Sequence, residues 1–266
     1  MIISSTANVR VKYIRSLANR QEREKTQHYF VEGIRIVGEA IQLGVDIDTL
    51  VYAPTLLKSP FALELVRKQQ EQNTPLLEVS SEVFKSLSVK DGPQGIGAVL
   101  QQQWKQLDQV VPQQHDLWVA LDAAQDPGNI GTILRTSDAV GCTGLLLLGH
   151  SADPYDAGAL RASMGAVFSQ QLIKASFDEF LQWKEQHALT VVGTSDAASV
   201  DYRAARYHRP LVLLMGSERE GLSPVQQTAC DTMVSIPMVG RSDSLNLAVA
   251  TGIVLYEIFY QTHHTG

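Results

Sequence analysis

The sequence predicts an α/β protein whose C-terminal part is built around a parallel sheet. Short, nearly continuous apolar runs recur in this part, as expected for strands that are buried on both faces of a parallel sheet. Segments with helical periodicity lie between the runs, and this alternation is typical of an α/β layered fold. A polar, glutamine-rich stretch at residues 101–116 precedes them and is interpreted as a linker. It separates a smaller α/β domain, residues 1–100, from a larger one, residues 117–266.

The smaller domain is predicted to contain a helix and at least two strands. Residues 32–43 carry apolar side chains at helical spacing, and Gly44 follows them as a suitable C-cap. Residues 49–53 and 95–100 are short β-rich runs. No catalytic motif is evident in this domain.

The larger domain contains five apolar runs that predict strands. They are residues 117–121, 144–148, 190–193, 210–215 and 234–237. Helices are predicted at residues 130–140, 177–187 and 245–260. Because ligands of such sheets bind beyond the carboxyl ends of the strands, a site is expected in the loops that follow Leu121, Met215 and Pro237.

Charge is distributed unevenly along the chain. The net charge is −6, yet residues 1–28 hold six cations and two anions and therefore carry +4. A basic leading segment on an acidic body is the pattern expected where a protein binds a polyanion, although an exposed helix of mixed charge explains it equally well. The candidate residues for contacts with such a polyanion are Arg10, Lys12, Arg15, Arg20 and Arg23.

Composition narrows the class of protein further. With 44% hydrophobic and 19% charged residues, the 266-residue chain is typical of a globular protein. Cys142 and Cys230 are too few for a disulfide framework, and no Cys/His cluster has zinc spacing, so we expect a reducing compartment and no metal. Residues 1–10 lack the apolar core of a signal peptide, and the uncharged stretch at residues 244–256 is shorter than the roughly 20 residues of a membrane span. We therefore expect a cytoplasmic protein with no membrane contact.

The loop that follows the first predicted strand of the larger domain combines a turn, a capping residue and a cation. Pro127-Gly128 forms the turn, and Asn129 follows at a position where it can cap a helix. Arg135 lies among apolar neighbours, a setting in which an arginine often needs a partner or a ligand. Each of these residues taken alone also fits a capped surface helix.

The other two loops are equally rich in polar residues and glycines. Gly216 and Gly221 allow the backbone to approach another group closely, and Glu218 between them can orient a polar group. Ser244 suits an N-cap, but capping does not explain Asn246 at the head of so apolar a helix. The motifs of dinucleotide-binding, P-loop, serine-hydrolase and zincin enzymes are absent from the sequence.

Together the three loops resemble a known set of motifs. The segments DPGNIGTILRTSDAVG, LLMGSEREGLS and VSIPMVGRSDSLNLAVATGIVLYEI look like the signature motifs of the SpoU (TrmH-like) RNA ribose 2′-O-methyltransferases, a family of the SPOUT superfamily. They occur in the expected order over residues 117–260. The segments HYFVEGIRIVGEAI through DGPQGIGAVL resemble the N-terminal RNA-substrate-binding domain of the same family.

The resemblance implies a C-terminal α/β knot, in which the chain end threads through a loop and shapes a pocket for S-adenosylmethionine. Threaded chains are very rare among protein folds, so general folding rules alone do not predict one here. It also implies a homodimer whose interface includes the knot and the last helix. The implied cofactor-binding residues, which act largely through backbone groups, are Gly216, Gly221, Ile236 and Leu245.

The resemblance further implies that five residues act in catalysis: Asn129, Arg135, Glu218, Ser244 and Asn246. In-line methyl transfer to a ribose 2′-oxygen asks the protein mainly for alignment and charge stabilisation, and it needs no metal. Because a guanidinium group stays charged in proteins, a clamp on the neighbouring phosphate and on the developing alkoxide suits Arg135 better than the role of general base.

Two alternatives of other classes are compatible with the sequence. One is a non-catalytic RNA-binding adaptor with the same fold, and the other is a different α/β nucleotide enzyme with accidental motif matches. Neither predicts saturable binding of S-adenosylmethionine. The substrate class is ribosomal or transfer RNA, and the separate N-terminal domain favours ribosomal RNA.

Overall fold

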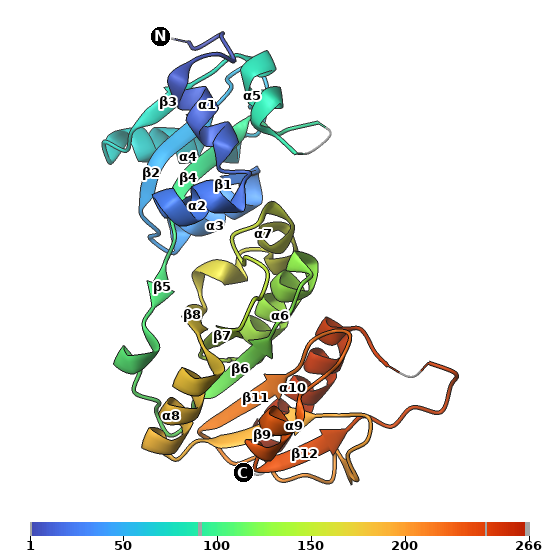
Figure 1. Ribbon diagram of the computed structural model, residues 1–266. Helices are drawn as coiled ribbons and strands as arrows, with labels where there is room; N and C mark the ends of the chain where they lie inside the picture. Colours follow the sequence, from blue (N-terminus) through green and yellow to red (C-terminus); the bar gives the residue numbers. More distant parts are fainter. Residues whose placement is uncertain (1, 90–91, 243, 264–266) are drawn as a thin grey trace. The chain divides into compact units, whose positions relative to one another are not determined.

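The computed structural model describes residues 2–89, 92–242 and 244–263, which belong to two compact units (Figure 1). Unit 1 comprises Met1–Gln102 and Tyr155–Phe168, and unit 2 comprises Gln103–Pro154 and Ser169–Gly266. This division differs from a single cut at the glutamine-rich stretch, because Tyr155–Phe168 packs within unit 1 although it lies far along the sequence of the larger domain.

Unit 1 is built on a mixed sheet of four strands in the order β1-β4-β2-β3. Strands β1 (His28–Glu32) and β2 (Ile47–Tyr52) run antiparallel to β4 (Ile96–Gln101), and β3 (Leu76–Glu78) runs parallel to β2. The helices of unit 1 are α1 (Val9–Ser16), α2 (Arg20–Thr26), α3 (Ile34–Gln42), α4 (Pro60–Glu71), α5 (Ser81–Leu87) and α7 (Ala157–Ser163), with a 3-10 turn at Ala166–Phe168.

The basic leading segment is part of the hydrophobic core of unit 1. Val11, Ile14 and Leu17 of this segment are buried against residues of β2, β4 and α5. Helix α3 buries the apolar face that its spacing predicts and ends before Gly44, which adopts a left-handed φ of +69°. The first 28 residues are therefore integrated into the fold.

Unit 2 contains a sheet of eight strands in the order β10-β12-β9-β11-β6-β7-β8-β5, in which every pair is parallel. The strands are β5 (Trp104–Lys105), β6 (Leu117–Asp122), β7 (Gly144–Leu148), β8 (Gln171–Ala175), β9 (Thr190–Thr194), β10 (Val200–Asp201), β11 (Leu211–Met215) and β12 (Thr232–Ser235). Four of the five predicted runs coincide with β6, β7, β9 and β11 to within a residue, whereas β12 begins two residues before the predicted run 234–237 and ends at Ser235. Every residue of β7 and β11 is buried, which is why these strands read as continuous hydrophobic runs.

The helices of unit 2 are α6 (Pro127–Ala139), α8 (Phe177–His187), α9 (Pro224–Thr228) and α10 (Leu247–His263), with a 3-10 turn at Leu107–Gln109. Helices α6 and α10 pack against each other. Trp118 of β6 meets Trp183 of α8 edge to face, with ring centroids 5.7 Å apart. In the described part of the chain, no helix combines the length and the apolarity needed to cross a bilayer.

The glutamine-rich stretch carries structure of its own, although composition predicts only a linker. Strand β5 pairs with β8 at the edge of the sheet, and Leu107 and Val110 are buried in the core of unit 2. The indole N–H of Trp183 donates to the carbonyl of Val110 at 2.9 Å. This stretch is therefore attached to unit 2 by a short strand, by two buried apolar side chains and by one side-chain hydrogen bond.

Candidate functional site

The strand order of the unit 2 sheet reverses beside β6. From β6 the chain passes outward through β7 and β8, and it then returns on the other side, where β11 pairs directly with β6. Leu121 and Met215 are partners near the carboxyl ends of these two strands. The loops after β6 and β11 therefore leave the sheet side by side, at the position where open α/β sheets bind their ligands.

Asp126, and not Asn129, caps helix α6. Its carboxylate accepts a hydrogen bond from the backbone N–H of Gly128 at 2.7 Å, and Pro127 is the first helical residue. Proline is favoured at this first position, which makes the residue before it the cap. Asn129 consequently lies in the first helical turn, where it is buried and its side chain is available for contacts outside the helix.

Three side chains from the three motifs form a hydrogen-bonded group, which we name the amide–carboxylate cluster: Glu218, Asn129 and Asn246. The Asn129 side-chain amide donates to Oε1 of Glu218 at 3.3 Å, and its Oδ1 accepts from Nδ2 of Asn246 at 2.9 Å. The backbone N–H groups of Gln125 and Asp126 also donate to Glu218, at 3.1 to 3.4 Å. The cluster therefore joins the loops after β6, β11 and β12.

The pKa of Glu218 is lowered below its usual range. Partial burial opposes ionisation, but the hydrogen bonds from the backbone of Gln125, from Asn129 and from the backbone of Asp126 stabilise the carboxylate more. Glu218 is therefore an acceptor for the amide groups around it at neutral pH.

Asn246 is also the residue that caps α10. Its Oδ1 accepts from the backbone N–H groups of Ala248 and Val249, at 2.9 and 3.3 Å, while its Nδ2 donates to Asn129. Ser244, whose simplest interpretation from the sequence is an N-cap, lies two residues earlier and lines a cavity instead. Asparagine provides both an acceptor and a donor, which explains why this residue type stands at the head of an apolar helix.

A cavity of about 330 Å³ lies beside the cluster, at the carboxyl ends of β9 and β11. Its lining includes all four residues predicted to bind the cofactor, together with two of the predicted catalytic residues, Glu218 and Ser244. The four are Gly216, Gly221, Ile236 and Leu245. Sequence reasoning missed Thr194, Ser195 and Asp196, which also line it, although they follow the predicted strand at residues 190–193.

The lining of this cavity suits S-adenosylmethionine. Met215, Leu222 and Leu247 provide apolar surface for a nucleoside and a thioether, while Asp196 and Glu218 provide negative charge for a sulfonium or ammonium group. Within the described ranges, no group of three or more His, Cys, Asp or Glu residues is arranged to hold a metal ion.

The two glycines of the second loop allow the loop to close on itself. Ser217 and Gly221 exchange backbone hydrogen bonds of 3.2 and 3.1 Å, and Gly221 has a left-handed φ of +65°. A Cβ atom on Gly216 would overlap the carbonyl group of Gly221. The close approach expected at these glycines is therefore between two backbone segments of the same loop, which forms a wall of the cavity.

Arg135 lies apart from the amide–carboxylate cluster and does not line the cavity. Its side chain is exposed on α6, and no hydrogen bond or ion pair links it to any residue that the structure describes. The guanidinium is therefore available to an external anion.

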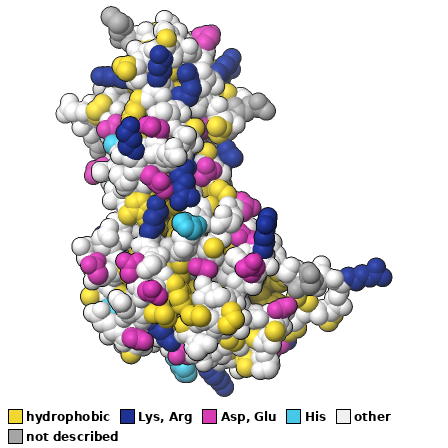
Figure 2. All heavy atoms as spheres, viewed as in Figure 1, with side chains coloured by type: hydrophobic (Ala, Val, Ile, Leu, Met, Phe, Trp, Pro, Cys, Tyr) yellow, Lys and Arg dark blue, Asp and Glu magenta, His cyan; other side chains and the backbone are white. Residues whose placement is uncertain are grey.

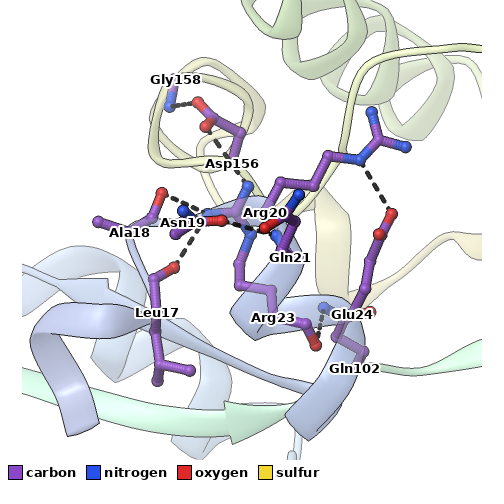
Figure 3. Close-up of polar contacts among 10 residues, drawn as sticks. All are labelled: Leu17, Ala18, Asn19, Arg20, Gln21, Arg23, Glu24, Gln102, Asp156 and Gly158. Carbon is purple, nitrogen blue, oxygen red and sulfur yellow. Dashed lines mark hydrogen bonds and ion pairs between the residues drawn. The ribbon is translucent and has the colours of Figure 1, made fainter.

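The predicted RNA-binding residues fall into two groups. Lys and Arg side chains are visible over α1 and α2 in Figure 2, and Arg10, Lys12, Arg15 and Arg20 are all exposed. Arg23 is only 3% exposed, and its guanidinium donates to the carbonyls of Leu17 and Ala18 and pairs with Asp156 at 3.5 Å (Figure 3). The prediction that Arg23 contacts RNA is corrected accordingly, because this arginine is buried and its guanidinium bonds to other residues of unit 1.

The comparisons with known proteins identify the family of the chain. The model of the SpoU rRNA Methylase family matches residues 116–256, and that of the MRM3-like substrate binding domain matches residues 8–98. The chain is 34% identical over 252 residues to the 23S rRNA (uridine(2479)-2'-O)-methyltransferase of Streptomyces viridochromogenes, covering 92% of this chain and 87% of that one. It is 27% identical over 257 residues to the 23S rRNA (guanosine(2553)-2'-O)-methyltransferase RlmP of Bacillus subtilis, covering 96% and 98%.

The fold is also that of a solved methyltransferase. The crystal structure of an AdoMet-bound rRNA methyltransferase from Sinorhizobium meliloti superposes with a TM-score of 0.90 at 37% sequence identity, covering 99% of this chain and 98% of that one. The α/β sheet, the three motifs at its carboxyl edge and these similarities together lead to one conclusion. The chain belongs to the SpoU rRNA methylase family.

Proposed function

We propose that the protein transfers a methyl group from S-adenosylmethionine to a ribose 2′-hydroxyl of ribosomal RNA. The observation that carries the proposal is the amide–carboxylate cluster, which ties the three motifs of the family together beside the cavity. The relatives named as 23S rRNA methyltransferases favour ribosomal over transfer RNA as the substrate class. The protein is thus an RNA ribose-2′-O-methyltransferase, and the proposed rRNA substrate supports a cytoplasmic location as part of this proposal.

The residues around the cavity would hold the cofactor. When bound, S-adenosylmethionine supplies a methyl group that its sulfonium activates for transfer. The backbone of Gly216 and Gly221 and the side chains of Ile236 and Leu245 provide the walls, and Ser244 lies at the same cavity. The carboxylates of Asp196 and Glu218 favour the positively charged sulfonium of the cofactor over the neutral thioether of the demethylated product.

The chain's own residues contribute position and charge. Glu218 fixes Asn129, and Asn129 fixes Asn246, so these polar groups keep one orientation relative to the cavity. Arg135 presents a permanent cation that clamps the phosphate next to the reacting ribose and stabilises the 2′-oxygen as negative charge develops on it. Alignment and charge stabilisation of this kind account for most of the work that the protein does in such a transfer.

Replacement of Arg135 tests the proposal directly. Arg135→Ala should lower single-turnover methylation of 23S rRNA by roughly 10²–10³-fold, the loss typical of removing one group that stabilises charge in the transition state. Affinity for S-adenosylmethionine should stay within about twofold of wild type, because Arg135 does not line the cavity. Arg135→Lys keeps the charge but loses the planar fork, and it should recover little activity.

One control and two contradicting outcomes complete this experiment. Arg67→Ala removes an exposed arginine of α4 in unit 1 and should methylate normally. Near wild-type transfer by Arg135→Ala would show that the active centre is assigned to the wrong residue. Failure of the wild-type protein to bind S-adenosylmethionine saturably would favour the adaptor over the enzyme.

The exposed face of α10 supports a homodimer as part of this proposal. Val249, Tyr256 and Tyr260 are 51%, 53% and 59% exposed, and their spacing of seven and four residues places them on one side of the helix. Such an apolar stripe on a helix is expected to bury itself against a partner. Membership of the family also leads us to propose the trefoil knot and a phosphate-binding role for Arg10, Lys12, Arg15 and Arg20.

A further inference from the structure

Unit 1 contains a cavity of its own, of about 530 Å³, and none of its lining residues belongs to the cofactor site. Helices α1 and α3, strand β1 and helix α7 all contribute to its walls. Leu17, Phe30 and Leu160 are among the apolar side chains that line it. The volume falls in the range of about 300–1,000 Å³ that is usual for ligand sites.

The charged residues that line the cavity are mostly arginines. Arg35 of α3 and Arg161 of α7 are exposed, and neither guanidinium group forms a hydrogen bond or an ion pair with any described residue. Arg15 donates to the hydroxyl of Ser86 at 2.8 Å, and this neutral partner brings no counter-charge. The charge of Arg23, by contrast, is balanced by the carboxylate of Asp156. The cavity therefore combines an apolar interior with three uncompensated guanidinium groups.

Two further polar groups line the cavity. Oε1 of Glu32 accepts from the backbone N–H of Val89 at 3.2 Å, and Oε1 of Gln94 accepts from the backbone N–H of Ile34 at 2.9 Å. These bonds fix a carboxylate and a side-chain amide at the wall. A carboxylate and an amide NH2 group can bond to the donors and acceptors on the edge of a base.

We propose that this cavity receives one unstacked nucleobase of the RNA substrate, while Arg35 and Arg161 hold the phosphates on either side of it. The inference rests on the proposed function, because it requires that RNA is the substrate of this protein. Bases in single-stranded RNA stack on aromatic side chains, and Phe30 offers such a surface in the wall. A purely apolar ligand would leave the guanidinium groups without a counter-charge, whereas an RNA strand presents a base and phosphates together.

Segment Tyr155–Phe168 gives the proposal a specific consequence. This segment carries Arg161 into unit 1, and Tyr155 packs on Tyr29 with ring centroids 4.5 Å apart. The cavity is thus walled by residues from two distant stretches of sequence. RNA recognition in unit 1 therefore depends on a segment outside residues 1–100.

Binding of 23S rRNA by the full-length protein tests the inference. The double variant Arg35→Ala/Arg161→Ala should bind about ten-fold or more weakly, and its salt dependence should be shallower by about 0.7 per lost phosphate contact. Arg67→Ala, which removes an exposed arginine of unit 1 outside the cavity, should bind as wild type. Affinity for S-adenosylmethionine should equal that of wild type in both variants.

A second variant separates a base pocket from a merely basic surface. Ala157→Phe fills the cavity without changing its charge, and it should weaken RNA binding while leaving the salt dependence as in wild type. Ultraviolet cross-linking of the wild-type protein to 23S rRNA should label the peptide of residues 26–35, which contains Phe30. If Ala157→Phe fails to fold, the cross-link and the arginine variants decide.

The outcomes distinguish this inference from the proposed function. Wild-type protein that does not methylate 23S rRNA contradicts the proposed function. Active wild-type protein together with unaltered RNA binding by the arginine variants overturns the pocket alone and points to an acidic peptide as the occupant. Weak binding by the arginine variants with no effect of Ala157→Phe and no cross-link at residues 26–35 also overturns it, because the arginines then act only as surface cations.

Discussion

Asn246 performs two tasks with one side chain. Its oxygen caps α10, and its NH2 group donates to Asn129. An aspartate at this position would still accept the capping bonds but has no N–H to donate, and a serine is shorter than the distance between the two sites requires. The residue therefore couples the start of the last helix to the amide–carboxylate cluster.

Asn246→Asp separates the two tasks. The cap should survive, so the free energy of unfolding should stay close to that of wild type. The donation to Asn129 should be lost and a second carboxylate placed near Glu218, so affinity for S-adenosylmethionine and single-turnover methylation should both fall. Asn246→Ala should in addition lose about 1 kcal/mol of stability, the usual cost of losing a helix cap. Normal catalysis by the folded Asp variant would show that Asn246 serves only as a cap.

The pKa of Glu218 leads to a prediction about pH. Since its folded pKa lies below the ordinary value, the hydrogen-bonded carboxylate contributes stability above that ordinary value, about 4.3. This contribution disappears as the pH falls through the folded pKa. The difference in unfolding free energy between wild type and Glu218→Gln should thus be constant from pH 8 to pH 6 and shrink below pH 4. A difference that grows on acidification would contradict the assigned hydrogen bonds.

At the residue scale, the sequence singles out polar residues that the structure brings together, but it is less informative about their local tasks. Asn129, Glu218 and Asn246 are found in one hydrogen-bonded cluster, but the caps of α6 and α10 are Asp126 and Asn246. Pro127 in the first turn is the signal that locates the first cap. The burial of Arg23 has no local signal, because its partner Asp156 lies more than a hundred residues away.

The loop between β11 and α9 depends on a glycine with no room for a side chain. Gly216→Ala should force Gly221 and Leu222 away, open the cavity wall and weaken affinity for S-adenosylmethionine by about ten-fold or more, in line with strained backbone costs of roughly 1–3 kcal/mol. Gly240→Ala is the matched control, because a Cβ at that position meets no atom within 4 Å. Isothermal titration of both variants checks the prediction, and equal affinities would contradict it.

At the scale of elements, continuous apolar runs are the sequence feature that predicts strands reliably. Strands β6, β7, β9 and β11 follow from them, but β8 does not, because Gln171 and Lys174 interrupt its apolar pattern. Strand β5 is two residues long within a glutamine-rich stretch and pairs only at the edge of the sheet. Pairing at an edge demands little hydrophobicity, so β5 has no strong apolar pattern.

At the scale of the whole molecule, the stripe on α10 predicts a dimer. Val249→Asp should shift the protein toward a monomer in sedimentation velocity, because it places a charge on the apolar stripe. Methyl transfer should fall with it if the site needs both subunits. Val225→Asp is the control, since Val225 is 66% exposed on α9 outside the stripe. A fully active monomeric variant would contradict the need for a dimer.

The division of the chain into its two units is only partly predictable from local sequence patterns. The sequence indicates two α/β domains, but the return of Tyr155–Phe168 to unit 1 depends on contacts such as Tyr29 with Tyr155 and Gly165 beside Glu39. These pair residues more than a hundred positions apart, beyond the reach of any local pattern. Deleting the first 28 residues is likewise a poor test of RNA binding, because α1 contributes Val11 and Ile14 to the core.

The interrupted sequence of unit 1 has a consequence for how the protein is made. Domains commonly acquire their structure on the ribosome in N- to C-terminal order, as each one emerges. Here the first hundred residues emerge without Tyr155 and α7, so Tyr29 lacks the ring of Tyr155 and Arg23 lacks the carboxylate of Asp156 until that later segment has left the exit tunnel. The N-terminal unit of this enzyme is thus completed only after much of the catalytic sheet has been translated.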